Sequence, residues 1–244
     1  MQSRLILLAS VVALGPTAGV AQAQTNTSQS AQFGYRAILL TPVGALPQIV
    51  QVQRPTKAAV ALRFGRYGFK DGPTNNIIGG SANVRLASRL HAGATFGYQT
   101  CTGCEGLTMG SIDLVAPLFH KAASNSNSGG NTDIQLQASA GMGKANTSDV
   151  SARSFALSAP LAVSLPQRED GLLTLFFAPA LGYGSLDESG VSDGSARMLI
   201  AAGVGYNFPG GLGAHATVHR IVIEDSPTQL GFALSWRFGG GSNR

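Results

Sequence analysis

Hydrophobic and polar residues alternate along the last part of the chain, over residues 231–238. One face of this stretch carries the apolar side chains Phe232, Leu234, Trp236 and Phe238. The other face carries small or polar side chains, including Ser235 and Arg237. A period of two puts successive side chains on opposite faces of a β-strand. The pattern therefore predicts a strand that separates an apolar medium from a more polar one.

Similar segments recur from residue 57 onward, separated by clusters of Gly, Pro, Asn, Asp and Ser. Each is about as long as a tilted strand that crosses a membrane. The expected strands are 57–69, 77–86, 90–100, 107–118, 132–144, 153–165, 172–184, 195–208, 212–223 and 231–238. They predict an all-β fold, an antiparallel up-and-down transmembrane β-barrel of about ten strands. Eight strands remain an alternative, because the polar connection expected over 120–131 is long for an inner turn.

Composition favours the same class of protein. Charged residues make up 12% of the chain, against about 25% in soluble proteins. No stretch after the N-terminus approaches the ~18 unbroken apolar residues of a membrane helix. The formal net charge is +5, and the basic residues are scattered along the chain. Scattered charge gives no basic patch, so nucleic acid is not an expected partner.

The N-terminus has the pattern of a secretory signal peptide. Arg4 precedes an apolar run over 5–20, and Ala21-Gln22-Ala23 matches an A-x-A cleavage site. The run is short for a membrane anchor, which is the alternative interpretation. We therefore expect a signal peptide over 1–23. The segment 24–56 is then expected to be a periplasmic arm, with its later part either leading in to the barrel or tucked into its mouth.

The barrel is expected over 57–238, with a tail over 239–244. Its last strand resembles the C-terminal strand of bacterial outer-membrane β-barrels, such as the small OmpA, OmpX or OmpW-like and porin-like proteins. The resemblance rests on four residues at alternate positions, Phe232, Leu234, Trp236 and Phe238. It implies that the barrel-assembly machinery reads this strand and that the protein resides in the cell outer membrane. It also implies contact with outer-membrane lipid or lipopolysaccharide.

Both cysteines lie in the short motif Cys101-Thr102-Gly103-Cys104. Haem attachment would require a histidine where Glu105 stands, and a zinc site would require further ligands. A thioredoxin-type pair would need a strand-to-helix setting, whereas these residues lie between two expected strands. The sequence thus favours a disulfide at a turn in an oxidising compartment, with redox chemistry as the alternative.

If the apolar faces contact lipid, the alternate positions face the lumen of the barrel. The polar residues expected there are Arg63, Arg85, Asp113, Gln135, Gln137, His215, His219 and Arg237. A barrel of about eight to ten strands is too narrow for an open porin channel, and side chains normally fill it. We expect the charged groups to compensate one another. A narrow conduit for small solutes is the alternative.

The spacing of His215 and His219 does not favour a metal site. On a strand the two histidines share a face but lie about 13 Å apart, too far for one ion. Catalysis is a further alternative, because some outer-membrane barrels of this size modify lipid A with His and Ser on strands. Either histidine could act as the base and Ser235 as the nucleophile, although the chain lacks a G-x-S-x-G elbow.

The glycine-rich pieces lack the context of a nucleotide-binding loop, and no cofactor is expected. We therefore expect a monomeric, non-enzymatic outer-membrane barrel with a structural or surface-interaction role. That role would depend on outer loops over 70–76, 100–106, 145–152 and 185–194. The alternatives are a narrow porin-like channel, a barrel enzyme that hydrolyses or transfers acyl chains of lipid A, and a secreted soluble barrel that binds an apolar ligand.

Overall fold

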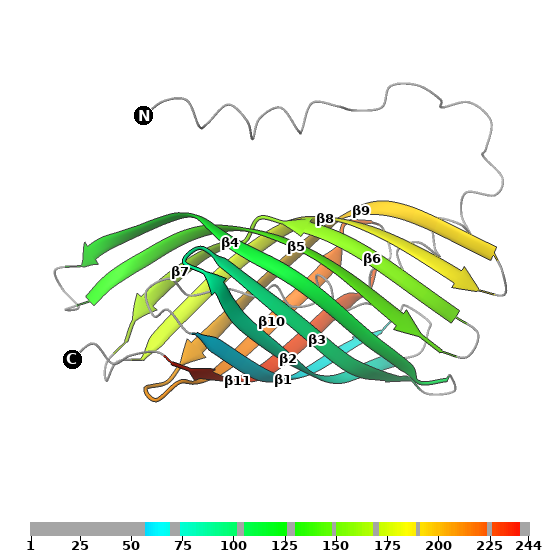
Figure 1. Ribbon diagram of the computed structural model, residues 1–244, viewed down its shortest axis with the longest axis horizontal. Coiled ribbons are helices and arrows are strands. Elements are labelled where there is room, and N and C mark those ends of the chain that lie inside the picture. The colour runs from blue at the N-terminus through cyan, green and yellow to red at the C-terminus, as the bar shows by residue number, and fades with distance from the viewer. Residues whose placement is uncertain are drawn as a thin grey trace, which may run out of the picture.

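The chain closes a ring of antiparallel strands (Figure 1). The computed structural model describes residues 57–68, 74–101, 105–125, 130–147, 150–167, 171–188, 191–223 and 226–239. The strands are β1 (Ala58–Gly68), β2 (Thr74–Ala87), β3 (Leu90–Cys101), β4 (Leu107–Asn125), β5 (Gly130–Asn146), β6 (Val150–Ser158), β7 (Leu161–Pro166), β8 (Leu172–Glu188), β9 (Val191–Asn207), β10 (Leu212–Ile221) and β11 (Thr228–Phe238). The pairings β4–β5 and β1–β11 complete the ring. The predicted all-β antiparallel barrel is confirmed.

The segment predicted as one strand over 153–165 is divided in two. β6 ends at Ser158 and β7 begins at Leu161, and both lie between β5 and β8. Pro160 stands at the break, and proline has no backbone N–H to donate to a neighbouring strand. Its carbonyl still accepts a hydrogen bond from the backbone N–H of Gln137, at 2.9 Å. β6 and β7 therefore share one place in the ring, which has ten strand places rather than eight.

The prediction of a polar connection over 120–131 is wrong. β4 continues to Asn125 and β5 begins at Gly130, so the two strands form a long hairpin. Pairing between β3 and β4 starts only at His91 and Val115, and the hairpin extends past β3 (Figure 1). Beyond the ring a strand no longer separates the outer surface from the lumen, so the alternation used to recognise strands is lost there. The shorter turn also removes the reason for considering eight strands.

The outer loops expected over 70–76, 100–106, 145–152 and 185–194 are shorter than predicted. Strands extend into each of these ranges. β2 begins at Thr74, and the β5–β6 hairpin is paired as far as Asn146. β8 and β9 are paired up to Glu188 and Val191. The range 185–194 is therefore the end of a hairpin rather than a broad loop.

Two edges of the barrel can be distinguished. β1 begins and β11 ends at the terminal edge, where Ala58 pairs with Phe238. The opposite edge is called the far edge. The β4–β5 hairpin projects at the terminal edge and the β8–β9 hairpin at the far edge (Figure 1). On β9, the last residue in register with β10 is Leu199, and the strand continues beyond this pair to Val191.

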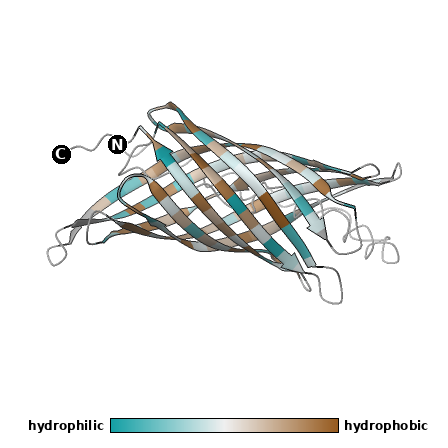
Figure 2. Cartoon of the chain, turned by 90° about the horizontal axis from the view of Figure 1, so that it is seen from below, coloured by the Kyte–Doolittle hydropathy of each residue, from teal (hydrophilic) through white to brown (hydrophobic). Residues whose placement is uncertain are grey.

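The outer wall of the barrel is apolar. Along β1, the side chains of Val60, Leu62 and Phe64 are 45%, 49% and 38% exposed, whereas the intervening residues are half-buried. The same alternation continues around the ring, and Figure 2 shows hydrophobic segments recurring along the strands. Phe96, at 72% exposure, is the most exposed of these large apolar side chains among the described residues. Contiguous exposed apolar surface marks a contact with a protein, a ligand or a membrane.

The inner wall holds small apolar clusters together with polar side chains. One cluster consists of Leu107, Met109, Ala145, Ala152 and Leu186, all near the far edge. Among the described residues, no helix is long and apolar enough to cross a membrane. The signal peptide expected over 1–23, the arm over 24–56 and residues 240–244 of the tail lie outside the described residues.

Candidate functional site

The lumen collects most of the polar residues that the sequence predicted there. Seven of the eight occupy positions on the inner wall, between neighbours that are more exposed: Arg63, Asp113, Gln135, Gln137, His215, His219 and Arg237. Arg85 also pairs with the inward-facing His91 but is itself exposed, because it lies near the terminal edge where the bulge in β2 shifts the register. The sequence pattern thus located a polar lumen, and the structure supplies its contacts.

The middle of the lumen contains the charges of β1 and β4. The Nε of Arg63 donates a hydrogen bond to the hydroxyl of Ser81 on β2, at 2.9 Å. Arg63 and Asp113 attract each other electrostatically. Opposite charges in a confined space offset part of the desolvation cost that each would carry alone. The attraction between Arg63 and Asp113 has the sign that the expected compensation requires.

A buried chain of hydrogen bonds links three strands near the far edge. The hydroxyl of Tyr67 on β1 donates to Oε1 of Gln99 on β3, at 3.0 Å. Nε2 of Gln99 donates in turn to Oδ1 of Asn75 on β2, also at 3.0 Å. All three side chains are at most 5% exposed. These three residues are absent from the polar set predicted for the lumen, although each lies at an inward position of its strand.

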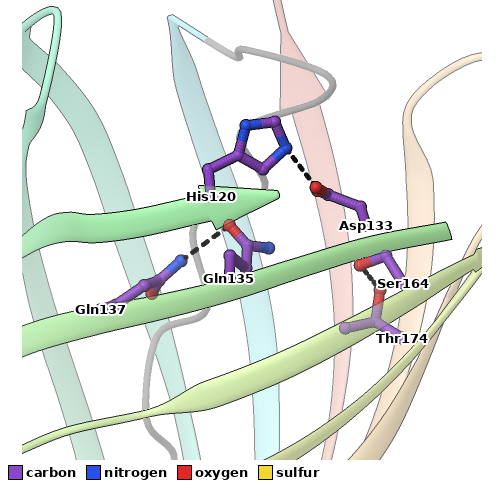
Figure 3. A network of polar contacts seen from close by, with 6 residues as sticks. All are labelled: His120, Asp133, Gln135, Gln137, Ser164 and Thr174. Carbon is purple, nitrogen blue, oxygen red and sulfur yellow. Dashed lines mark hydrogen bonds and ion pairs between the residues drawn. The ribbon is translucent and has the colours of Figure 1, made fainter. Parts of the chain in front are cut away.

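Another polar cluster lies near the terminal edge (Figure 3). His120 on β4 pairs with Asp133 on β5, and Asp133 is 1% exposed. On the same strand, Nε2 of Gln137 donates to Oε1 of Gln135 at 3.3 Å, and both side chains are fully buried. The hydroxyls of Ser164 and Thr174 are 3.0 Å apart on the neighbouring β7 and β8.

Four members of this cluster are missing from the predicted site, and two of them, Asp133 and His120, form its ion pair. Asp133 continues the alternation that located Gln135 and Gln137, so the same pattern could have found it. His120 could not be found in this way, because a register shift between Pro117 and Phe119 changes the face on which it lies. A β-bulge of this kind redirects the side chains that follow it.

His215 and Ser235 are brought together, as the catalytic alternative requires. Nε2 of His215 lies 3.0 Å from the hydroxyl oxygen of Ser235 on the adjacent β11. His219, four residues further along β10, contacts Gln229 instead, with 3.3 Å between Nδ1 and Oε1. Among the described residues, no group of three His, Cys, Asp or Glu side chains could hold a metal ion.

Glycines make room for this part of the lumen. A Cβ atom at Gly205 would lie 2.5 Å from Nδ1 of His215, so the imidazole ring occupies the space above this residue. A Cβ atom at Gly203 would lie 2.5 Å from the carbonyl oxygen of Ala216 and 2.6 Å from the ring of Phe176. Glycine at both positions therefore relieves crowding between neighbouring strands.

The aromatic residues of the last strand lie on the outer wall where the ring closes. Phe232, Leu234 and Trp236 pair with the outward-facing residues of β1. They are between 42% and 52% exposed, as is Phe238. The C-terminal pattern of alternating apolar residues therefore lies on β11, the strand that closes the ring by pairing with β1. The disulfide expected between Cys101 and Cys104 lies outside the described part of the structure.

No protein-family model and no curated protein sequence matches the chain. Among solved structures, the β domain of the Bordetella autotransporter BrkA is 10% identical, with a TM-score of 0.42 over 74% of this chain and 98% of that one. The attachment invasion locus protein Ail of Yersinia pestis is 8% identical, with a TM-score of 0.33 over 74% of this chain and 95% of that one. The outer membrane enzyme PagL is 10% identical, with a TM-score of 0.36 over 74% and 98%. Similarity this remote carries no argument about function.

Proposed function

We propose that the chain is a monomeric β-barrel of the bacterial outer membrane that acts as a non-enzymatic scaffold and contacts other surfaces through its β8–β9 hairpin. The signal-peptide pattern over 1–23 supports export, and the apolar outer wall supports insertion in lipid. Strand closure satisfies the backbone hydrogen bonds that a membrane interior cannot. In barrels with an even number of strands, both ends lie at one edge, and we assign the terminal edge to the periplasm and the far edge to the outside.

The packing of the lumen supports a scaffold over an open conduit. The contact chain of Tyr67, Gln99 and Asn75 connects β1, β2 and β3 close to the far edge. Deeper in the lumen, Arg63 donates a hydrogen bond to Ser81 and is attracted electrostatically to Asp113. Buried hydrogen bonds of this kind each contribute about 0.5–1.5 kcal/mol and hold side chains in place. Side chains held in this way occupy part of the lumen, as expected for a barrel of ten strands.

The single observation that supports surface contact is the projection of the β8–β9 hairpin. Residues 191–198 extend past the last β9–β10 pair, Leu199 with Ile221. At the rise of a β-strand, this is about 25 Å of chain beyond the neighbouring strand. Asp187 and Ser192 on this hairpin are exposed. A hairpin that projects past its neighbouring strand presents these side chains to a partner surface.

The test compares intact cells that produce the full chain with cells that produce a variant in which residues 185–194 are replaced by a two-residue Asn-Gly turn. Adherence to collagen-coated plastic, to bare glass and to one another is measured at matched outer-membrane levels of the barrel. We expect at least one form of adherence to fall severalfold in the shortened variant. Unchanged adherence in all three assays would contradict the surface-interaction role.

The channel alternative is tested on the same protein in planar lipid bilayers. The scaffold proposal predicts no stable conductance. Discrete current steps that change when Arg63 or Asp113 is replaced by Ala would favour a conduit through the lumen instead. A loss of the steps would be meaningful only if the variants still show heat-modifiable migration on detergent gels, which reports a folded barrel.

A second candidate function is acyl hydrolysis, which the 3.0 Å contact between His215 and Ser235 specifically favours. A serine hydroxyl within hydrogen-bond reach of an imidazole has the geometry of a nucleophile with its base. Labelling of the folded barrel by a fluorophosphonate probe, lost on Ser235→Ala and on His215→Gln, would support this activity. An absence of labelling in the wild-type protein would leave the pair as a lumen contact.

A further inference from the structure

An amphipathic groove crosses the outer wall of the barrel near the far edge. It has a volume of about 440 Å³ and is formed by β11, β1, β2 and β3. Gly65 and Gly231, which pair directly with each other, lie between the two rows of side chains that border it. Residues without a side chain leave a depression between these rows. The groove is therefore part of the outer surface and does not open from the lumen.

One side of the groove is apolar. Phe64, Ile78 and Phe232 lie on this side, and the register places them opposite one another on adjacent strands. They are 38%, 51% and 43% exposed. This wall lies farther from the far edge than the rest of the groove, because each of these residues is farther from the far-edge end of its strand. It thus faces the part of the membrane that contains hydrocarbon.

The other side of the groove carries polar groups on three of its four strands, and Leu230 of β11 completes the row beside Arg66. Arg66, Asn76 and Thr100 form one row across β1, β2 and β3, because Arg66 pairs with Asn76 and Asn76 pairs with Thr100. All three are exposed on the outer wall. Arg66 is two residues from Gly68, the last residue of β1. An outward arginine costs about 2–4 kcal/mol at the middle of a bilayer but only about 0–1 kcal/mol near its surface. The position therefore fits the boundary between headgroups and acyl chains.

We propose that this groove is a binding site for one phosphate-bearing lipid. The phosphate lies on Arg66, and an acyl chain lies along Phe64, Ile78 and Phe232. A guanidinium donates two parallel hydrogen bonds to a phosphate. A headgroup with a net negative charge is favoured over phosphatidylcholine, because the choline cation of phosphatidylcholine competes with Arg66 for the phosphate. The side chains of Asn76 and Thr100 supply further polar contacts beside it.

Charge complementarity is the observation that selects an anionic lipid. Arg66 is the one charged residue that lines the groove among the described residues, and no carboxylate competes for it there. The apolar wall beside it excludes a ligand that is only an anion, since a free phosphate leaves Phe64 and Phe232 uncovered. The proposal rests on the proposed insertion of the barrel in a membrane, and it names a lipid that the barrel holds there.

The experiment is native mass spectrometry of the full mature barrel, released from detergent micelles with added phosphatidylglycerol or phosphatidylcholine. We expect the wild-type barrel to retain one phosphatidylglycerol with about tenfold preference over phosphatidylcholine, which corresponds to one charge-assisted contact. Arg66→Gln is expected to remove this preference. Phe64→Ala is expected to weaken retention of phosphatidylglycerol severalfold. It is not expected to increase retention of phosphatidylcholine.

Arg220→Gln is the matched control. Arg220 is also an exposed arginine on the outer wall near the far edge, but it does not line the groove. Its replacement is expected to change retention less than twofold. Equal losses in the Arg66→Gln and Arg220→Gln variants, or retention unchanged in Arg66→Gln, would overturn the proposal. Displacement of the lipid by millimolar inorganic phosphate alone would also overturn it, because the apolar wall would then contribute nothing.

Heat-modifiable migration, measured in each sample, distinguishes a failure of the lipid-groove proposal from a failure of the membrane-barrel proposal. A wild-type barrel that shifts on boiling but shows no lipid preference contradicts the groove and leaves membrane insertion intact. A wild-type protein that folds without detergent and shows no shift contradicts membrane insertion, and the lipid site is then overturned with it.

Discussion

Replacement of Leu62 by arginine tests whether the outer wall contacts lipid or water. Leu62 lies near the middle of β1, is 49% exposed and pairs with the outward-facing Leu234. In a membrane, an arginine at mid-depth on the lipid face costs about 2–4 kcal/mol. In water, the same substitution at an exposed site is expected to change stability by about 0.5 kcal/mol or less. The difference is large enough to measure.

Leu86→Arg is the control for this substitution. Leu86 is 59% exposed but lies one residue from Ala87, the end of β2 at the terminal edge. Near the membrane surface the cost falls to about 0–1 kcal/mol. The assay is guanidinium unfolding of the barrel refolded into lipid vesicles, followed by the fluorescence of Trp236, the only tryptophan of the chain. Equal and small effects of the two substitutions would refute the assignment of the outer wall to lipid.

Three further substitutions test the interior. Gly203→Val is expected to destabilise the barrel by about 1–3 kcal/mol, because its side chain would overlap the carbonyl oxygen of Ala216 and the ring of Phe176. The midpoint of unfolding measures this loss, and an unchanged midpoint would contradict the crowding. Tyr67→Phe leaves Gln99 without its buried donor and is expected to cost about 1–3 kcal/mol, whereas no loss would argue against an ordered chain of contacts. Asp133→Asn removes the charge paired with His120. The rate of backbone amide hydrogen exchange in the β4–β5 hairpin is expected to rise severalfold more than that in β1. A uniform rise in both would argue against a local role of this ion pair.

Much of the fold could be predicted because a membrane barrel repeats one simple pattern. A strand with lipid on one side and a polar lumen on the other must alternate, and 231–238 and 132–144 do so clearly. Both were found as strands, although β5 is longer than expected. The same pattern placed Arg63 and Asp113 together in the lumen.

Strand ends and interruptions were not predictable in this way. Beyond the ring, the ends of β4 and β9 do not separate an outer surface from the lumen, so their residues need not alternate and the sequence there resembles a loop. Pro160 divides a strand without disturbing its apolar pattern. The outer groove was also missed, because Arg66 belongs to a row that forms only when four strands are brought into register.

The contact between His215 and Ser235 was anticipated, but its meaning was not decided by the pattern. The register places Ser235 opposite Gly213 and His215 opposite Ala233, so the 3.0 Å contact is a diagonal one between inward positions of neighbouring strands. The same geometry serves a lumen contact and a catalytic pair, and the labelling experiment distinguishes them.

The central claim is that lipid surrounds this barrel, and the most direct measurement is quenching of Trp236 by brominated phospholipids. Trp236 lies on the outer wall of β11 and is 52% exposed. In vesicles that contain lipids brominated along the acyl chain, the account predicts strong quenching that depends on the position of the bromine. Fluorescence that is unaffected by brominated lipid but quenched by acrylamide in water would contradict it.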